Sequence, residues 1–243
     1  MSGKVWKILG FGFMFLVMAG VAYAVEGGEE TEVHRKSLFD LFKATGVVGI
    51  LLLLTSLIGT ALLIQYMVSM GESKLGNPAL LSEVETLLSE GNVEDAFSMA
   101  QADASYAGKV MAGALSRSVG GYEEAKKGLE ESALVEGFRL NAKISYLSLI
   151  GNIGPLLGLL GTVTGMITSF QKIETMKSPT PADLAVGVYE SLVNTTMGLF
   201  IAIIFLSSFF FMKNKISDLT LRINNEIGEI LSRTLAQGAT GGK

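Results

Sequence analysis

Long hydrophobic runs without charge dominate the pattern of this chain. Three of them extend from Ala44 to Gly71, from Ile144 to Gln171 and from Ser191 to Met212. Each exceeds the roughly 20 residues that an α-helix needs to cross the hydrocarbon core of a bilayer. The pattern therefore predicts an all-α integral membrane protein with three transmembrane helices.

A fourth run, from Ile8 to Val25, has the features of a signal peptide. It is shorter than the other three, follows two lysines and ends in Ala22-Tyr23-Ala24, the small-x-small pattern that signal peptidase accepts. Cleavage leaves Val25 as the first residue, outside the cytoplasm. A retained membrane anchor is the alternative, because a run of this length just spans a bilayer.

The remaining segments have the periodicity of helices. Pro78 at a first helical position, with Asn77 as its cap, predicts a helix with the apolar face Leu80, Leu81, Val84, Leu87 and Leu88. Nothing interrupts a helix from Tyr122 to about Phe170, so the second span is predicted to continue as a long rod into the cytoplasm. The third span is predicted to extend toward Leu235 through the apolar positions Ile216, Leu219, Ile223, Ile227, Ile230 and Leu231.

Basic residues beside the spans indicate the orientation. Arg139 and Lys143 precede the second run, and Lys213 and Lys215 follow the third, which favours a cytoplasmic location for both borders and a periplasmic N-terminus. The expected organisation is a signal peptide (1–24), a short periplasmic N-terminus (25–43), transmembrane helix 1 (44–71), a cytoplasmic helical domain (72–143), transmembrane helix 2 (144–171), a periplasmic loop (172–183), transmembrane helix 3 (184–212) and a cytoplasmic C-terminal helix and tail (213–243).

The composition limits the classes of function that the chain could have. An apolar content of 49% and a mean hydropathy of +0.46 fit a membrane protein. The chain has no cysteine, so disulfides and thiolate metal sites are excluded. The chain has no basic patch with interleaved aromatic residues, so nucleic acid is not expected as a partner. The lone His34 lies in a charged segment before the first span, where no partner is evident. We therefore expect no catalytic residue, metal or cofactor, and an intramembrane protease, which would need a histidine base, is disfavoured.

Small and weakly polar residues form a stripe on each of the last two spans. On a helical wheel, one set falls within an arc of about 80° and the other within about 100°. The sets are Pro155, Gly158, Thr162, Gly165 and Ser169 in the second span, and Gly187, Ser191, Asn194, Thr195, Gly198 and Ala202 in the third. One interpretation is helix packing, because small residues let backbones approach. The other is a water-accessible pore or a groove for another helix.

Glu190 and Asn194 favour the pore interpretation. A carboxylate within a span is costly unless it faces water or a partner, and Asn194 lies one turn further along, within reach of a hydrogen bond to Glu190. By helical rise, Thr162 and Thr195 lie at the same depth in an antiparallel hairpin. Hydroxyl groups can carry water, but they cannot hold and release a proton at ordinary pH. Because no aspartate, histidine or lysine lies at that depth, a proton carrier would have to come from another polypeptide.

Two motifs resemble those of the ExbB/TolQ/MotA proton-channel family, and the resemblance is strongest to ExbB and TolQ. They are PLLGLLGTVTGM at residues 155–166 and LAVGVYESLVNTTMGL at residues 184–199. Their separation and the long segment before them are also typical of that family. Thr162 and Thr195 match its pore threonines, and Glu190 matches its membrane glutamate. Asn194 and Thr196 depart from the pattern, because ExbB-like sequences often have alanine there.

The resemblance implies a stator of an inner-membrane motor. A homo-oligomer of this chain, a pentamer, would surround the transmembrane helices of an ExbD-like or TolR-like single-span protein, whose aspartate carries the proton. A TonB-like or TolA-like protein would then convey the work across the periplasm. An ExbB-like role in energising outer-membrane transport and a TolQ-like role in envelope integrity share this mechanism. A MotA-like flagellar stator fits less well, because that branch has four spans, and a non-conducting membrane scaffold is a further alternative.

Overall fold

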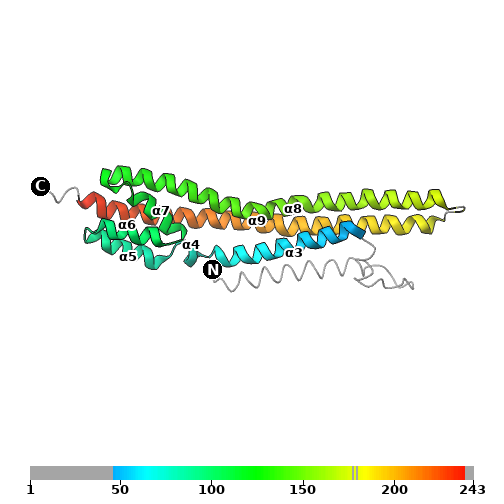
Figure 1. Ribbon diagram of the computed structural model, residues 1–243, viewed down its shortest axis with the longest axis horizontal. Coiled ribbons are helices and arrows are strands. Elements are labelled where there is room, and N and C mark those ends of the chain that lie inside the picture. Colours follow the sequence, from blue (N-terminus) through cyan, green and yellow to red (C-terminus); the bar gives the residue numbers. More distant parts are fainter. Residues whose placement is uncertain (1–45, 177, 179, 239–243) are drawn as a thin grey trace. The chain divides into compact units, whose positions relative to one another are not determined.

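The computed structural model describes residues 46–176, 178 and 180–238, and every regular element in these ranges is helical. Figure 1 shows the elements along the chain. They are α3 (Gly46–Ser69), α4 (Glu72–Leu75), α5 (Pro78–Ser89), α6 (Val93–Ala102), α7 (Tyr106–Leu115), the 3₁₀ turn η1 (Ser118–Gly120), α8 (Tyr122–Thr175) and α9 (Pro181–Gly238). The predicted signal peptide, its alternative as an anchor and the segment that contains His34 lie outside the described residues.

Three of the described helices are long and apolar enough to cross a membrane: Gly46–Ser69, Tyr122–Thr175 and Gly187–Leu235. The prediction of an all-helical chain with three candidate spans is therefore confirmed. The long rods are confirmed as well, because α8 has 54 residues and α9 has 58. Both helices continue without a break from an apolar segment into a charged one.

The chain divides into two compact units. Among the described residues, the first unit comprises 46–59 and 149–207, and the second comprises 60–148 and 208–238. In the first unit, α3 meets α9 where Gly59 faces Phe205, since a Cβ atom on Gly59 would lie 2.5 Å from Cζ of that ring. The parts of α8 and α9 in this unit, residues 149–175 and 181–207, are called the hairpin below.

The second unit has a core of aliphatic side chains from α5, α7, α8 and α9. The predicted apolar stripe of α9 is buried at all of its positions, with Ile227 and Leu231 fully inaccessible to solvent. The predicted face of α5 is buried except for Leu87, which is half-buried. Burial of a large aliphatic side chain stabilises a fold by roughly 1.5–3 kcal/mol, so these stripes hold the unit together.

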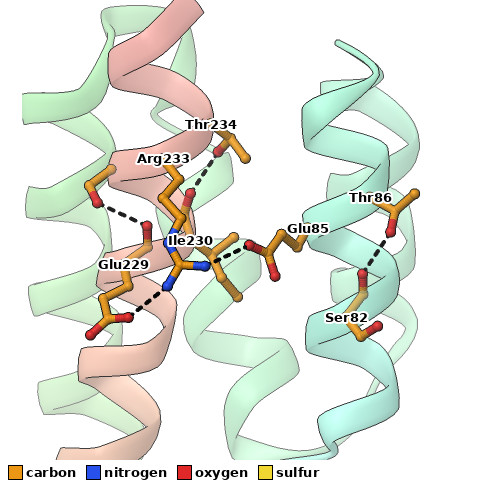
Figure 2. Close-up of polar contacts among 8 residues, drawn as sticks. Ser82, Glu85, Thr86, Glu229, Ile230, Arg233 and Thr234 are labelled. Atoms are coloured by element: carbon orange, nitrogen blue, oxygen red, sulfur yellow. Dashed lines mark hydrogen bonds and ion pairs between the residues drawn. The ribbon is translucent and has the colours of Figure 1, made fainter.

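Polar contacts complement this core at the end of α9. Arg233 donates to Glu85 of α5 over 3.2 Å and to Glu229 of its own helix over 2.9 Å, as Figure 2 shows. These side chains are largely exposed, so each ion pair contributes at most about 1 kcal/mol. Deeper in the unit, the Tyr106 hydroxyl of α7 donates to Oδ1 of Asn224 over 2.9 Å. Both contacts fix the rotation of α9 relative to the shorter helices.

The side chain of Asn77 does not cap α5, contrary to the expectation. Asn77 stands at the N-cap position with a positive φ of 37°, but its side chain accepts no hydrogen bond from the helix. Its Nδ2 donates instead to Oδ2 of Asp103 over 2.7 Å, and Oδ1 of Asp103 accepts from the backbone N–H of Ser105 over 2.6 Å. Ser105 in turn caps α7 by accepting from the N–H of Gly108. The asparagine therefore ties the start of α5 to the start of α7.

These hydrogen bonds affect the titration of Asp103. Burial alone would raise the pKa of this carboxyl, but the hydrogen bonds from Ser105 and Asn77 outweigh burial and lower the pKa below its ordinary value. A carboxyl with a lowered pKa in the folded state stabilises the fold above its unfolded-state pKa of about 3.9. That contribution is lost as the pH falls through the folded-state pKa.

Asp103→Asn is expected to destabilise the second unit by about 1–3 kcal/mol, because an amide nitrogen would then face one of the two donors. The thermal stability of the wild type should also fall more steeply than that of the variant below about pH 4. Circular dichroism of the purified full chain in detergent measures both effects. Asp218→Asn, which removes an exposed ion pair with Arg222, is the control and should change stability by less than about 1 kcal/mol.

Gly198→Ala is expected to destabilise the hairpin, because the added methyl group would lie 2.5 Å from the carbonyl oxygen of Gly154. Overpacking of this kind costs about 1–3 kcal/mol, and the midpoint of thermal unfolding should fall accordingly. Gly228→Ala is the matched control in the same helix, since a Cβ atom there meets nothing within 4 Å. It should be stabilising by about 0.5–1 kcal/mol, because alanine loses less conformational entropy in a helix. Equal shifts for the two variants would contradict the close packing.

Candidate functional site

The two stripes of small residues face one another within the hairpin. A Cβ atom on Gly158 would lie 3.0 Å from Cα of Thr195, and one on Gly187 would overlap the hydroxyl of Ser169. Gly165 is opposed to Ser191 in the same way. The structure therefore brings together these stripe residues: Gly158, Gly165 and Ser169 of α8 with Gly187, Ser191, Asn194, Thr195 and Gly198 of α9.

The contact face of α8 is rotated from the predicted one. Gly151, Gly154 and Gly161 also meet α9, opposite Leu206, Ile201 and Asn194 respectively, whereas Pro155 and Thr162 are only half-buried. Relative to Gly158, the contacting residues from Gly151 to Ser169 lie between about −60° and +20° on a helical wheel, and Pro155 and Thr162 lie at about +60° and +40°. The three missed glycines share the three-four spacing of the stripe, so the sequence contained a signal for them.

Most hydroxyl groups of the stripes are bonded to their own helix. Ser169 donates to the carbonyl of Gly165 over 2.9 Å, and Ser191 to that of Gly187 over 2.7 Å. Thr162 likewise donates to Leu159 over 2.7 Å. Such bonds satisfy a hydroxyl in surroundings without water, at the cost of making it unavailable as a donor elsewhere.

Thr195 differs, because its hydroxyl links the two helices. Oγ1 of Thr195 donates to the carbonyl oxygen of Gly158 over 3.2 Å. The bond is possible because Gly158 has no side chain to cover its backbone. The bond places Thr195 opposite Gly158, which lies four positions before Thr162. The depths of the two threonines along the hairpin therefore differ by no more than about one helical turn, or 6 Å. The predicted common level of the two hydroxyls therefore holds to within one turn.

Asn194 is buried between the helices. Its side chain is 4% exposed, and its Oδ1 has no hydrogen-bond partner among the described residues. The backbone of Glu190 belongs to α9, but its side chain lies outside the described part. The expected hydrogen bond between Glu190 and Asn194 therefore stays a prediction. Elsewhere in the described ranges, no three histidine, cysteine, aspartate or glutamate side chains gather where they could hold a metal ion.

These contacts bear on the two interpretations of the stripes. Packing accounts for Gly158, Gly165, Ser169, Gly187, Ser191 and Gly198, each of which meets the facing helix. That packing does not account for Thr162 and Pro155, which lie at the border of the contact face of α8. The arrangement defines a helical membrane protein in which two spans form a close glycine-rich hairpin with hydroxyl groups inside the membrane.

The chain belongs to the MotA/TolQ/ExbB proton channel family, whose sequence model matches residues 99–225, just over half of the 243 residues. This match confirms the resemblance that the two motifs indicated. The matched range contains all of α8, the whole hairpin and part of the segment before them.

Several relatives are similar to parts of the chain. A Tol-Pal system protein TolQ from Pseudomonas aeruginosa is 40% identical over 65 residues, which are 27% of this chain and 28% of the relative. A biopolymer transport protein exbB1 from Vibrio cholerae is 46% identical over 66 residues, 27% of this chain and 29% of the relative. A putative biopolymer transport protein ExbB homolog from Methanothermobacter thermautotrophicus is 25% identical over 185 residues, 75% of this chain and 65% of the relative. The chain thus spans less than two thirds of the length of each of these relatives.

Thr195→Val is expected to destabilise the hairpin by about 0.6 kcal/mol, the average for hydrogen bonds between helices in a membrane, and by no more than about 1.7 kcal/mol. Thr162→Val should cost less, because the hydroxyl it removes is bonded within its own helix. Both changes nearly conserve volume, so a difference between them reports the interhelical bond. Unfolding in mixed detergent micelles with increasing dodecyl sulfate measures it, and equal losses of stability would contradict the bond to Gly158.

Proposed function

We propose that this chain is an ExbB-like stator subunit of a motor driven by the proton-motive force. The motor energises TonB-dependent transport across the outer membrane. In this proposal the subunit lies in the bacterial inner membrane, with a periplasmic N-terminus and a cytoplasmic C-terminus. Copies of the chain, five in number, surround the span of an ExbD-like partner, and a TonB-like protein receives the work.

One observation carries the proposal. The hairpin holds the hydroxyls of Thr162 and Thr195 within about one turn of the same depth, while the uncharged runs 144–171 and 191–212 contain no group that titrates near neutral pH. A path lined in this way can solvate a proton but cannot carry it alone. An aspartate supplied by the partner completes the path.

The spans and their borders support the proposed orientation. The cytoplasmic region consists of residues 72–143 and 213–243, and the segment 172–183 lies in the periplasm. Residues Lys143 and Lys213 then lie at the cytoplasmic border of the second and third spans, as the bias of basic residues toward the cytoplasm requires. Thr162, Thr195, Glu190 and Asn194 form the proton pathway within these spans, and the remaining stripe residues pack the hairpin that holds them.

A TolQ-like role in envelope integrity is the second candidate. The observation that favours it is the relative from Pseudomonas aeruginosa, whose identity of 40% over 65 residues is comparable with the 46% over 66 residues of the exbB1 protein. Co-purification separates the two roles. An ExbB-like subunit should retain an ExbD-like single-span protein in detergent, and a TolQ-like subunit should retain a TolR-like one.

Proton flux into liposomes under an applied potential tests the mechanism. The protein alone should conduct little, and the protein co-reconstituted with an aspartate-bearing single-span partner should conduct well, because the carrier is supplied by that partner. In the co-reconstituted complex, Thr162→Val and Thr195→Val should each abolish most of the flux while size-exclusion chromatography still shows the assembled complex.

Two controls make the result decisive. A partner whose aspartate is changed to asparagine should assemble and fail to conduct. Thr86→Val, on an exposed face of α5 and remote in sequence from the spans, should leave the flux unchanged. Flux from this chain without a partner would overturn the two-component proposal and transfer the role of carrier to Glu190. Assembly without flux under all conditions would favour a non-conducting scaffold.

A further inference from the structure

The part of α8 in the second unit carries a patch of exposed apolar side chains. Leu134 and Phe138 are each 75% exposed, and Val135 beside them is half exposed. On a helical wheel the three positions fall within an arc of about 100°, roughly opposite Leu129 and Leu147, which α8 buries. Leu134, Val135 and Phe138 are called the α8 patch below. Apolar side chains gathered on one exposed face are typical of a contact with protein or membrane.

Exposed apolar side chains of this size are rare in the rest of the same unit. Within residues 72–143 and 213–235, the others are Val119 and Leu221, which are 99% and 61% exposed. The remaining apolar stripe of α9, from Ile216 to Leu231, is buried in the core. The α8 patch and Leu221 therefore stand out from a surface that is otherwise mostly polar.

Leu221 of α9 lies at about the same level of the unit as the α8 patch. The helix α7 relates the two, because its Tyr106 donates to Asn224 of α9 and its Lys109 pairs with Glu136 of α8. Tyr106 and Lys109 are about one helical turn apart, so Asn224 and Glu136 lie at similar levels. Leu221 precedes Asn224 by three residues, and the α8 patch lies on both sides of Glu136 in the sequence.

These levels favour a second copy of this chain as the occupant of the patch. In a closed ring of membrane proteins the rotation axis runs along the membrane normal, so all copies have the same depth and facing residues are level. The α8 patch of one copy can then meet an apolar side chain of the next copy only at its own level. Leu221 fulfils this condition. Val119 does not, because it lies beside the start of α8, about 18 Å from Leu134 by helical rise.

Charged side chains near the two sites have opposite signs at similar levels. By helical rise, Arg139 of α8 and Asp218 of α9 lie about 8 and 9 Å from the ends of the uncharged runs 144–171 and 191–212. Glu131 of α8 and Arg222 of α9 lie about 20 and 15 Å from the same ends. All four side chains are exposed although each pairs within its own chain. The charges of α8 therefore complement those of α9 in a neighbouring copy.

A lipid surface fits the patch less well. The headgroup layer extends about 5–8 Å beyond the hydrocarbon core on each side of a bilayer. Leu134 lies ten residues before the uncharged run 144–171, or about 15 Å by helical rise. In a helix that crosses the membrane, this end of the patch is therefore in the aqueous phase.

We propose that the α8 patch docks against Leu221 on α9 of a neighbouring copy of this chain. The two surfaces differ, so the contact is head-to-tail and a repeated rotation closes a ring. The proposal rests on the proposed function only in that the chain assembles from several copies. It adds a contact outside the spans, where burial of apolar surface drives association. Between helices inside a bilayer, that driving force is largely missing.

Cross-linking of engineered cysteines tests the contact, since the chain has no cysteine of its own. Full chains with Leu134→Cys are co-expressed with full chains with Leu221→Cys, and the isolated membranes are oxidised with copper phenanthroline. The pair should give at least about five-fold more covalent dimer than either variant expressed alone, because a disulfide requires Cα atoms within about 7 Å of each other. Val119→Cys with Leu221→Cys is the matched control. It offers a more exposed position at the wrong level and should give little dimer.

A second measurement uses polar substitutions in the patch. Leu134→Ser combined with Phe138→Ser should weaken association about ten-fold or more, equivalent to about 1.4 kcal/mol. Light scattering coupled to size-exclusion chromatography in detergent measures the change, and Val119→Ser should leave the association unchanged. Both substituted side chains are 75% exposed, so circular dichroism should show an unchanged helix content. Retained helix with lost assembly separates the contact from a failure to fold.

Each further outcome has a defined meaning. Dimers of Leu134→Cys with itself, or equal yields for the Val119→Cys control, would overturn the head-to-tail contact. Quenching of Phe138→Trp fluorescence by lipids with brominated acyl chains, above the wild-type level, would identify the membrane as the occupant and also overturn it. If the pair cross-links but the complex with its partner conducts no protons, the contact stands and the proposed function fails. Conduction without a cross-link gives the opposite conclusion.

Discussion

The close approach of α8 and α9 is the constraint on which the membrane part of this structure depends. The two helices can approach only because glycine occupies the contact positions. Gly154 and Gly158 face Gly198 and Thr195 so closely that no side chain would fit between them. In a bilayer there is little hydrophobic driving force between helices, because lipid tails are as apolar as leucine. Dispersion contacts between backbones and a few hydrogen bonds must therefore hold the hairpin together.

The same closeness explains the polar residues in the spans. A hydroxyl group in hydrocarbon needs an acceptor, and the carbonyl of the preceding helical turn is always available. Ser169 and Ser191 use it. Thr195 instead reaches Gly158 because the missing side chain exposes that carbonyl. Oδ1 of Asn194 has no such partner among the described residues, so the glycine stripe that admits this side chain leaves its amide oxygen in need of a donor.

Much of this arrangement could be predicted from the sequence, because membrane spans and amphipathic helices leave strong periodic signals. The three candidate spans, the two long rods and the buried stripe of α9 from Ile216 to Leu231 follow from hydropathy and three-four spacing alone. The rotation of α8 was not predicted, since Gly154 and Pro155 point about 100° apart on a helical wheel and the sequence of α8 alone does not say which direction faces α9. Only the partner helix decides which of them is in contact. The role of Asn77 was missed for a related reason, because its acceptor, Asp103, is 26 residues away.

The filled interior of the hairpin also limits where a proton could travel. Gly158, Gly165, Ser169, Gly187 and Ser191 touch the opposite helix, so the space between α8 and α9 within one chain has no room for a partner helix. The proposed pathway must therefore run along an outer edge of the hairpin, where Thr162 remains half-exposed. Thr195 is also half-buried and reaches the same edge from the other helix. An assembly that turns these edges toward a common axis would line a cavity with hydroxyl groups while each hairpin stays closed.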